Sequence, residues 1–350
     1  MPAAQRPDVL IVSLGSTEGL RIADRQLHDS LERAGASVAI AQAQPPAPTR
    51  TLMLTDLAWA RAARAAAGAA LAELRDSPPN AVVYSSTTAA LLWPRPGAIR
   101  FDAPSAGNRP GRHGLWQRPL ERRRLGEAPL LLPWSEGGLR ETAAVAARGT
   151  DRALVLPVYV EPSGPREPVR DITAITYAAN PSKKGLDRVL AAWRGVYGEL
   201  PAGEPRELVV TGASAQTLRA AGLDLDSAPG VRVVGALVAD EYRALVRRAR
   251  VFVCAPRRED YGIAQLEALA DGCVLVSAPA PGPYAALPIA RALDARTVDD
   301  DLQGALRAVL SDPPGDYASR ALEALAPFRR AAVDRLVADE LLPRLLVPLS

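Results

Sequence analysis

The stretch "VFVCAPRREDYGIAQLEALADGCVLVS", residues 251–277, contains signals for a strand, a loop, a helix and a second strand in immediate succession. Val251–Ala255 is a short, fully apolar run of the kind that predicts a buried strand. After the loop Arg257–Gly262, a nearly continuous apolar segment predicts one short helix over Ile263–Gly272, and "CVLVS" predicts the next strand. Strands that alternate with helices in this way form parallel sheets with crossover helices.

The same alternation occurs in both halves of the chain. In the first half, a predicted strand over Val9–Leu14 precedes a glycine-containing turn, a helix that ends at Gly35 and a strand over Val38–Ala41. In the second half, the segment "DITAITYAANPSKKGLDRVLAAWRGV" begins another series of strand, turn and helix. The fold class that this predicts is α/β, with two Rossmann-like domains that face each other and contain parallel sheets.

The domain boundary is expected in a proline-rich stretch. Residues 157–171, "PVYVEPSGPREPVRD", hold four prolines and one glycine between two strand signals, as a linker does. We therefore expect a first domain over residues 1–160, a linker over 161–170 and a second domain over 171–328. The remaining residues, about 329–350, predict a helix with an apolar stripe, for which the first domain is a candidate packing surface.

The composition limits the class of protein. Of 350 residues, 48% are hydrophobic and 23% are charged, which is typical of a globular protein. A net charge of +3 is too small to indicate a nucleic-acid partner. No apolar run reaches the roughly 18 residues that span a bilayer, and the N-terminus shows no secretory signal, so we expect a cytoplasmic protein. Cys254 and Cys273 are expected to be buried thiols, and two histidines leave little room for a histidine-built metal site.

Two carboxylates lie where a ligand binds in such a fold. Ligands of open α/β sheets bind at the carboxyl ends of strands and against helix N-termini, and the loop that follows Val251–Ala255 is such a place. A carboxylate can accept two hydroxyl hydrogen bonds at once, as it does from a ribose, so Glu259 and Glu267 indicate a nucleotide-sugar. Alternatively, Glu259 and Asp260 cap the helix and Glu267 pairs with an arginine. The candidate ligand-binding residues of this stretch are Glu259, Asp260, Tyr261, Gly262, Ile263 and Glu267.

The residues from Glu259 onward resemble a known motif. "EDYGIAQLEALADGCVLVS" is similar to the motif of two glutamates separated by seven residues in the retaining glycosyltransferases of family 4, which have the GT-B fold. The resemblance extends over most of the chain: "YAANPSKKGLDRVLAAW" resembles the segment with the diphosphate lysine, and "VRVVGALVADEYRALVRRARVFV" resembles the segment whose glycine loop contacts the base. The residues that match the glutamate motif are Glu259, Gly262, Leu266, Glu267, Ala268, Ala270 and Gly272.

The resemblance implies a role for each matched residue. In the family the second glutamate binds the ribose and the first meets the donor sugar, which implies these roles for Glu267 and Glu259. Lys184 would neutralise the leaving diphosphate, because fixed positive charge is needed where negative charge develops. The implied reaction moves a sugar, which we expect to be a hexose, from a UDP-sugar or GDP-sugar to a hydroxyl of a glycan, lipid or small molecule. The resemblance also implies that the anomeric configuration is retained and that no metal or other cofactor is needed. The positions implied to meet the base are Gly235, Ala236 and Leu237.

The first domain supplies further candidates. In the turn "SLGSTEGLR", Gly15 and Gly19 flank amides at a helix start, which attract phosphate, and in the family this loop faces the donor diphosphate. A tight turn alone would also explain both glycines. Asp102 aligns with an acidic position of the family's catalytic region. His113 could act as a general base or contact the acceptor, although a single loop histidine more often does neither.

Two departures from the family pattern affect this interpretation. Phe101 stands where many members have a histidine, and Ala179 stands where they have an arginine near the diphosphate lysine. These changes keep an alternative open, in which the chain is a non-catalytic GT-B scaffold that binds a nucleotide-sugar or a protein partner.

The segment "IRFDAPSAGNRPGRHGLWQRPLERRRL" holds seven arginines from Arg100 to Arg124. Three interpretations stay open: a solvated basic face, a site for an anionic acceptor, and a contact with an anionic membrane, to which each basic residue near the surface contributes about 1 kcal/mol. In the third case the cytoplasmic protein would be peripheral at the inner face of the membrane, with Leu115 and Trp116 as apolar contacts.

Overall fold

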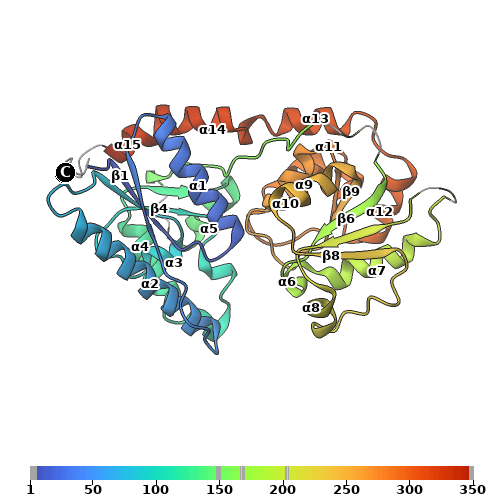
Figure 1. Ribbon diagram of the computed structural model, residues 1–350, viewed down its shortest axis with the longest axis horizontal. Coiled ribbons are helices and arrows are strands. Elements are labelled where there is room, and N and C mark those ends of the chain that lie inside the picture. The colour runs from blue at the N-terminus through green and yellow to red at the C-terminus, as the bar shows by residue number, and fades with distance from the viewer. Residues whose placement is uncertain are drawn as a thin grey trace. The chain divides into compact units, whose positions relative to one another are not determined.

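The computed structural model describes residues 6–146, 151–165, 167, 170–201, 203 and 205–346. The chain divides into two compact units, the first formed by Met1–Tyr159 with Arg330–Ser350 and the second by Val160–Arg329. Each unit contains one parallel five-stranded sheet with helices around it (Figure 1). The predicted α/β class with parallel sheets is therefore confirmed. Within the described residues, no helix is long and apolar enough to cross a membrane.

The sheet of the first unit has the strand order β2-β1-β3-β4-β5. Its central strand β1 pairs in parallel with β2 on one side and with β3 on the other, so that Val9 lies opposite both Val38 and Ala81. All residues of β1 are buried, as expected for a strand covered on both faces. The strands are β1 (Val9–Ser13), β2 (Val38–Gln42), β3 (Ala81–Tyr84), β4 (Ala98–Phe101) and β5 (Leu131–Pro133).

Alternate residues of β1 enter two separate cores. Leu10 and Val12 pack in the cluster that contains residues of α2, and Val9 and Ile11 pack in the cluster that contains residues of α1 and of the C-terminal helices. The C-terminal helices thus cover the same face of the sheet as α1 (Figure 1). The helices of this unit are α1 (Glu18–Arg33), α2 (Leu52–Glu73), α3 (Thr87–Ala90), α4 (Gln117–Glu127), α5 (Glu136–Val145), α14 (Arg330–Leu336) and α15 (Leu342–Leu346), with 3₁₀ turns η1 (Ser105–Gly107) and η2 (Gly111–Gly114) and a π-helical turn η6 (Val337–Leu341).

Polar contacts fix the C-terminal helices to α1. Ser30 Oγ donates to Asp334 Oδ1 at 2.7 Å, and Arg33 forms an ion pair with the same carboxylate at 2.8 Å. The apolar stripe of the C-terminal helices consists of Val333, Val337, Leu341 and Leu345, which pack in the core of the first unit.

The sheet of the second unit has the order β10-β9-β6-β7-β8. Its strands are β6 (Ile172–Tyr177), β7 (Leu208–Thr211), β8 (Val231–Gly235), β9 (Ala249–Cys254) and β10 (Val274–Ser277). Its helices are α6 (Pro181–Lys184), α7 (Leu186–Tyr197), α8 (Ala215–Ala220), α9 (Ala239–Arg248), α10 (Ile263–Ala270), α11 (Ala286–Leu293), α12 (Leu302–Ser311) and α13 (Tyr317–Ala324), with 3₁₀ turns η4 (Ala295–Thr297) and η5 (Ala326–Phe328).

The strand order places a switch point between β6 and β9. The chain runs from β6 outward through β7 to β8 and then returns to β9 on the other side of β6. The loops after β6 and β9 therefore diverge from adjacent strand ends, which leaves the crevice where open α/β sheets bind ligands. In the first unit the corresponding point lies between β1 and β3.

The segment between the two predicted domains is held against the second unit. Ser163 donates from its backbone N–H to Asp271 Oδ1 at 2.8 Å, and Arg170 donates to the carbonyl oxygens of Ala249 and Asp271 at 2.7 and 3.0 Å. The described residues of 161–170 thus pack on α10 and β9.

Candidate functional site

The loops after β6 and β9 are joined at the switch point. Asn180 caps the short helix α6 by accepting the Lys183 N–H at 3.0 Å, and the Arg257 N–H donates to Lys183 O at 3.0 Å. Gly185 follows α6 with a φ of +62°, and a Cβ at this position would overlap the carbonyl oxygen of Ala255. Only glycine allows both this backbone conformation and this close approach. The sequence "KKG" is thereby held at the end of β9.

Two ion pairs cross between these loops. Lys184 Nζ lies 2.6 Å from Glu259 Oε2, and Lys183 Nζ lies 3.0 Å from Asp260 Oδ2. Arg258 Nε donates to the other oxygen of Asp260 at 2.8 Å. The Lys184 side chain is 21% exposed, whereas the side chain of Glu259 is 8% exposed. Lys184 is therefore a cation that a diphosphate could still reach from solvent.

Glu259 is anchored from a second direction by α10. Gln265 Nε2 donates to Glu259 Oε2 at 3.1 Å, and both side chains are buried. A buried carboxylate requires such partners, and here an ammonium and an amide share one oxygen. Gln265 lies between the two motif glutamates, but nothing in the sequence pattern distinguishes it as a site residue.

The first turn of α10 begins at Gly262, which has a φ of +88° and is the N-cap residue without a side-chain capping bond. Glu259 and Asp260 precede this N-cap residue and pair with Lys184 and Lys183, so Gly262, and neither carboxylate, stands at the N-cap position. A Cβ at Gly262 would come within 2.9 Å of the Tyr284 ring, so this turn also requires glycine. Tyr261 is buried, and Ile263 is half-buried at the first position of the helix.

Glu267 lies on α10 one turn after Ile263 and has an arginine partner. Arg243 Nη1 donates to Glu267 Oε1 at 3.2 Å, as the alternative interpretation of this glutamate expected. Burial raises the pKa of the Glu267 carboxyl, Arg243 opposes that shift and Asp271 adds to it. The ion pair does not exhaust the carboxylate, which offers about four lone-pair sites. A ligand hydroxyl could therefore share Glu267 with Arg243.

The implied base-contacting residues lie between β8 and α9. Gly235 ends β8 with a φ of +79°, and Ala236 and Leu237 lead into α9, which carries Arg243. The Gly212 N–H donates to Gly235 O at 2.7 Å and so joins the ends of β7 and β8. This loop thus connects directly to the partner of Glu267.

The candidates of the first unit lie at its own switch point and after β4. Gly15 has a φ of +55° in the loop between β1 and α1, whereas Gly19 lies within the first turn of α1, behind the capping residue Thr17. Asp102 follows β4 and accepts the Ala103 N–H at 2.7 Å. His113 is exposed in η2. Gly15, Gly19, Asp102 and His113 therefore belong to a different unit from Lys184 and the two glutamates.

Phe101, which replaces the family's histidine, is a core residue. It is buried in the same cluster as Leu10 and Val12. Its side chain is thus part of the packing beneath the sheet end.

The seven arginines from Arg100 to Arg124 do not all form an exposed basic surface. Arg100 is only 2% exposed, donates to Ala23 O at 2.8 Å and lies over the ring of Trp134. Arg109 pairs with Asp56 at 2.6 Å, and Arg123 and Arg124 both pair with Glu127. The segment contributes less net surface charge than its composition implied, because Arg100 is buried and Arg109, Arg123 and Arg124 have acidic partners. Arg112 and Arg122 are exposed.

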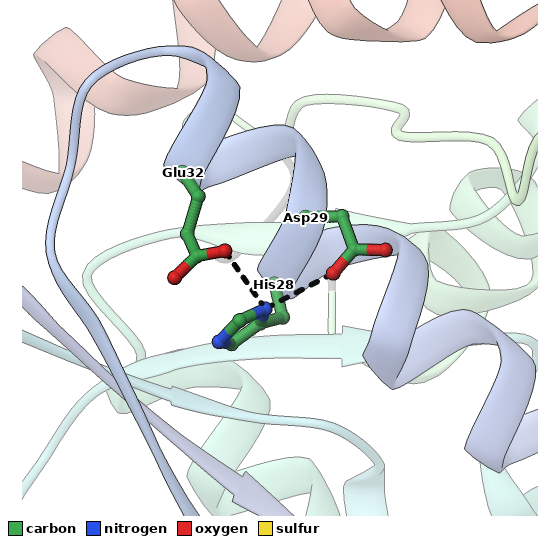
Figure 2. Close-up of side chains that lie close together, drawn as sticks. All are labelled: His28, Asp29 and Glu32. Atoms are coloured by element: carbon green, nitrogen blue, oxygen red, sulfur yellow. Dashed lines mark hydrogen bonds and ion pairs between the residues drawn. The ribbon is translucent and has the colours of Figure 1, made fainter.

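One group of possible metal ligands occurs in the described part of the chain. His28, Asp29 and Glu32 lie together on α1 (Figure 2), with His28 Nδ1 at 3.1 Å from Asp29 and at 3.6 Å from Glu32. Both carboxylates are more than half exposed, so water solvates them without an ion. Exposed acidic groups are common without a bound ion, so this cluster does not by itself indicate a metal site.

Residues 171–312 match the family model of the glycosyl transferases group 1. The matched segment contains both loops of the switch point and all of α9 and α10. No curated protein matches the chain in sequence.

Solved structures of the same fold cover nearly the whole chain. WaaG, a glycosyltransferase involved in lipopolysaccharide biosynthesis, is 16% identical with a TM-score of 0.68, over 95% of this chain and 98% of its own. Sucrose-phosphate synthase from Thermosynechococcus elongatus is 15% identical with a TM-score of 0.64, over 96% and 98%. An E. coli structure described as trehalose-6-phosphate bound with UDP-2-fluoro glucose is 11% identical with a TM-score of 0.65, over 95% and 98%. The likeness shows the GT-B fold, as predicted.

Proposed function

We propose that this protein is a retaining glycosyltransferase that moves a hexose from a UDP-sugar or GDP-sugar to a hydroxyl acceptor. The observation that carries the proposal is the ion pair of Lys184 with Glu259 at the switch point of the second sheet, with Glu267 on the helix that follows. The family match over residues 171–312 supports sugar transfer, because it includes all three residues.

Each part of a nucleotide-sugar has a chemical counterpart in the second unit. The diphosphate would meet Lys184, the sugar hydroxyls Glu259, the ribose diol Glu267, and the base the loop Gly235–Leu237. The E. coli structure bound with UDP-2-fluoro glucose shares the fold, which supports a donor of this class.

In the proposed reaction the acceptor hydroxyl attacks the anomeric carbon on the face from which the diphosphate leaves. A bond forms between the acceptor oxygen and that carbon while the bond between the carbon and the diphosphate oxygen breaks. The negative charge that develops on the departing oxygen is stabilised by Lys184, and the proton of the acceptor hydroxyl passes to the released diphosphate on the same face. Ala179 removes one cation from the family pattern, and Arg258, held near the site by Asp260, is the candidate replacement. Because a fixed ammonium stabilises the leaving group, we expect transfer without a metal, so a chelator should leave the rate unchanged.

We further propose that the acceptor is anionic or is presented at an anionic surface. The exposed Arg112 and Arg122, rather than all seven arginines, support this part of the proposal. The structural likeness to WaaG is compatible with it but concerns the fold alone.

Thermal unfolding with UDP, GDP and ADP would test the donor class. A ligand at 100 times its dissociation constant adds about 2.7 kcal/mol to the free energy of unfolding, so one nucleoside diphosphate should raise the Tm clearly. Incubation with the matching nucleotide-sugars and detection of released nucleoside diphosphate then separates a transferase from a scaffold that binds without turnover. No shift with any of the three nucleotides would reject the proposed donor site.

A further inference from the structure

Arg243, on α9, connects three groups around the candidate ribose carboxylate. Its Nη1 donates to Glu267 Oε1 at 3.2 Å, its Nε to Asp271 Oδ2 at 2.6 Å, and its Nη2 to Glu161 O at 2.9 Å. Each of the three guanidinium nitrogens thus has a different acceptor. A planar guanidinium with three fixed contacts cannot rotate without breaking at least one of them.

Asp271, the second carboxylate that accepts a hydrogen bond from Arg243, is itself held by several contacts. The Asp271 side chain is completely buried and accepts hydrogen bonds from the Ser163 N–H at 2.8 Å and from Ser163 Oγ at 2.9 and 3.0 Å. Asp271 also ends α10, one turn after Glu267. Arg243 therefore joins two carboxylates of one helix face, which would otherwise repel each other, to the segment Glu161–Ser163.

This arrangement limits where Glu267 can point. Among the described residues, Arg243 is the cation paired with Glu267, and the contact uses one carboxylate oxygen. The side chain of Arg243 is 12% exposed, so water competes little for this bond. A vicinal diol needs two acceptor positions in a fixed orientation, which a freely rotating glutamate would supply only part of the time.

We propose that Arg243 is a positioning residue that fixes the orientation of the Glu267 carboxylate, so that it can accept hydrogen bonds from both hydroxyls of a ribose. The inference rests on the proposed function, since it takes the ligand of Glu267 to be a nucleoside diphosphate. Arg243 itself need not touch the ligand. Its effect is on recognition of the ribose hydroxyls and not on the diphosphate, which Lys184 meets.

The chain offers a matched control one turn along the same helix. Arg247 Nη1 donates to Ser163 Oγ at 2.6 Å, so this arginine also binds the Glu161–Ser163 segment, but its acidic partner is Glu167, at 3.6 Å. Removing Arg247 should disturb the same segment while leaving the carboxylate pair intact. Arg243→Lys keeps the positive charge but cannot make the three directed contacts of the guanidinium. This variant therefore distinguishes the effect of the charge from the effect of the fixed orientation.

The test compares the dissociation constants of UDP and 2′,3′-dideoxy-UDP, and of GDP and its dideoxy analogue, by calorimetry. In the unmodified protein, loss of both hydroxyls should weaken binding about 10-fold or more, as expected for charge-assisted hydrogen bonds. Arg243→Met and Glu267→Gln should both reduce this ratio to nearly 1, Arg243→Lys should give an intermediate ratio, and Arg247→Met should leave it unchanged.

The opposite results are equally distinct. If folded Arg243→Met has a lower Tm but the full ratio, Arg243 is structural only and the inference is overturned. Should Arg243→Met fail to fold, Arg243→Lys decides in the same way. Nucleotide binding that does not distinguish the dideoxy analogue in the unmodified protein rejects the ribose role of Glu267, and binding of neither nucleotide rejects the proposed function itself.

Discussion

Lys184 Nζ lies 2.6 Å from Glu259 Oε2, although 75 positions separate the two residues in the chain. The pair forms because β6 and β9 are hydrogen-bonded neighbours, so the loops that follow them begin at adjacent strand ends. In the absence of a ligand each side chain neutralises the other. A bound nucleotide-sugar would replace this ion pair with two new contacts. The diphosphate would pair with Lys184, and the sugar hydroxyls would donate to Glu259.

Lys184→Ala should lower turnover far more than stability. The charge acts mainly as the diphosphate departs, so we expect kcat to fall roughly 10²–10³-fold, as for removal of other transition-state donors. The measurement is transfer rate beside thermal unfolding. Lys183→Ala is the control, because Lys183 is about twice as exposed, at 43%, and pairs with Asp260 instead. A silent Lys184→Ala with an inactive Lys183→Ala would show that Lys183 is the diphosphate residue.

Gly185→Ala should damage both stability and activity. A positive φ costs an L-residue roughly 1–2 kcal/mol, and at this position the new Cβ would also overlap Ala255 O, so we expect a loss well above that value. Gly222→Ala isolates the first effect, because Gly222 has a φ of +79° with no atom within 4 Å of the added Cβ. Denaturant unfolding of the two variants measures the difference. Equal losses would mean that the close approach at β9 is not tight.

Asp24 should make the stability of the first unit depend on pH in an unusual direction. Burial raises the pKa of Asp24 to about 6, and the Ser13 hydroxyl, which donates to it, only partly opposes this. The folded state then holds a proton that the unfolded state releases, so this group adds stability as the pH falls from above 6 towards 4. The full effect is at most about 3 kcal/mol for a shift of two units.

The measurement is the free energy of unfolding from pH 7 to pH 4 for the unmodified protein and for Asp24→Asn. Because other carboxylates titrate in the same range, only the difference between the two curves reports Asp24. That difference should change with pH in favour of the unmodified protein as acid is added. Parallel curves would mean that the Asp24 carboxyl binds its proton equally well in the folded and unfolded states, so that burial does not raise its pKa.

The sequence was most informative where the relevant residues are neighbours in the chain. The strand predicted over Val251–Ala255 is β9, Ala249–Cys254, and the helix predicted over Ile263–Gly272 is α10, Ile263–Ala270. Both were recognisable because a buried strand and a short buried helix differ in length and in their flanking residues. Glu259 and Glu267 could be assigned to the end of the same strand because the loop and the helix that carry them follow that strand directly in the chain.

What could not be predicted depends on partners that are distant in sequence. Arg243 and Glu267 are 24 positions apart on different helices, and periodicity does not tell which arginine of α9 faces α10. Arg100 was predicted as one of the basic surface residues, but it lies on the buried strand β4. There it donates to the carbonyl oxygen of Ala23 and lies over the ring of Trp134. Composition gives the charge of a segment and not its burial.

An anionic bilayer should bind to the first unit through a mixed apolar and basic surface. Leu52, Met53 and Leu54 at the start of α2 are exposed, and so is Leu115, at 62%, in the adjoining loop. The ion pair of Arg109 with Asp56 ties that loop to α2 and neutralises the acid there. Exposed apolar side chains favour an interface with anionic lipid when exposed arginines lie on the same unit, as Arg112 and Arg122 do here.

The prediction is that the protein sediments with vesicles containing phosphatidylglycerol but not with purely zwitterionic vesicles. Binding should weaken as salt rises, because exposed charges are screened beyond about 8 Å at physiological ionic strength. Replacing Arg112 and Arg122 with glutamine, or Leu52 and Leu115 with serine, should each reduce the bound fraction several-fold. Val238→Ser is the control, since Val238 is equally exposed, at 65%, but lies in the second unit. Equal sedimentation of all four proteins would show that this surface is a solvated face and not a membrane contact.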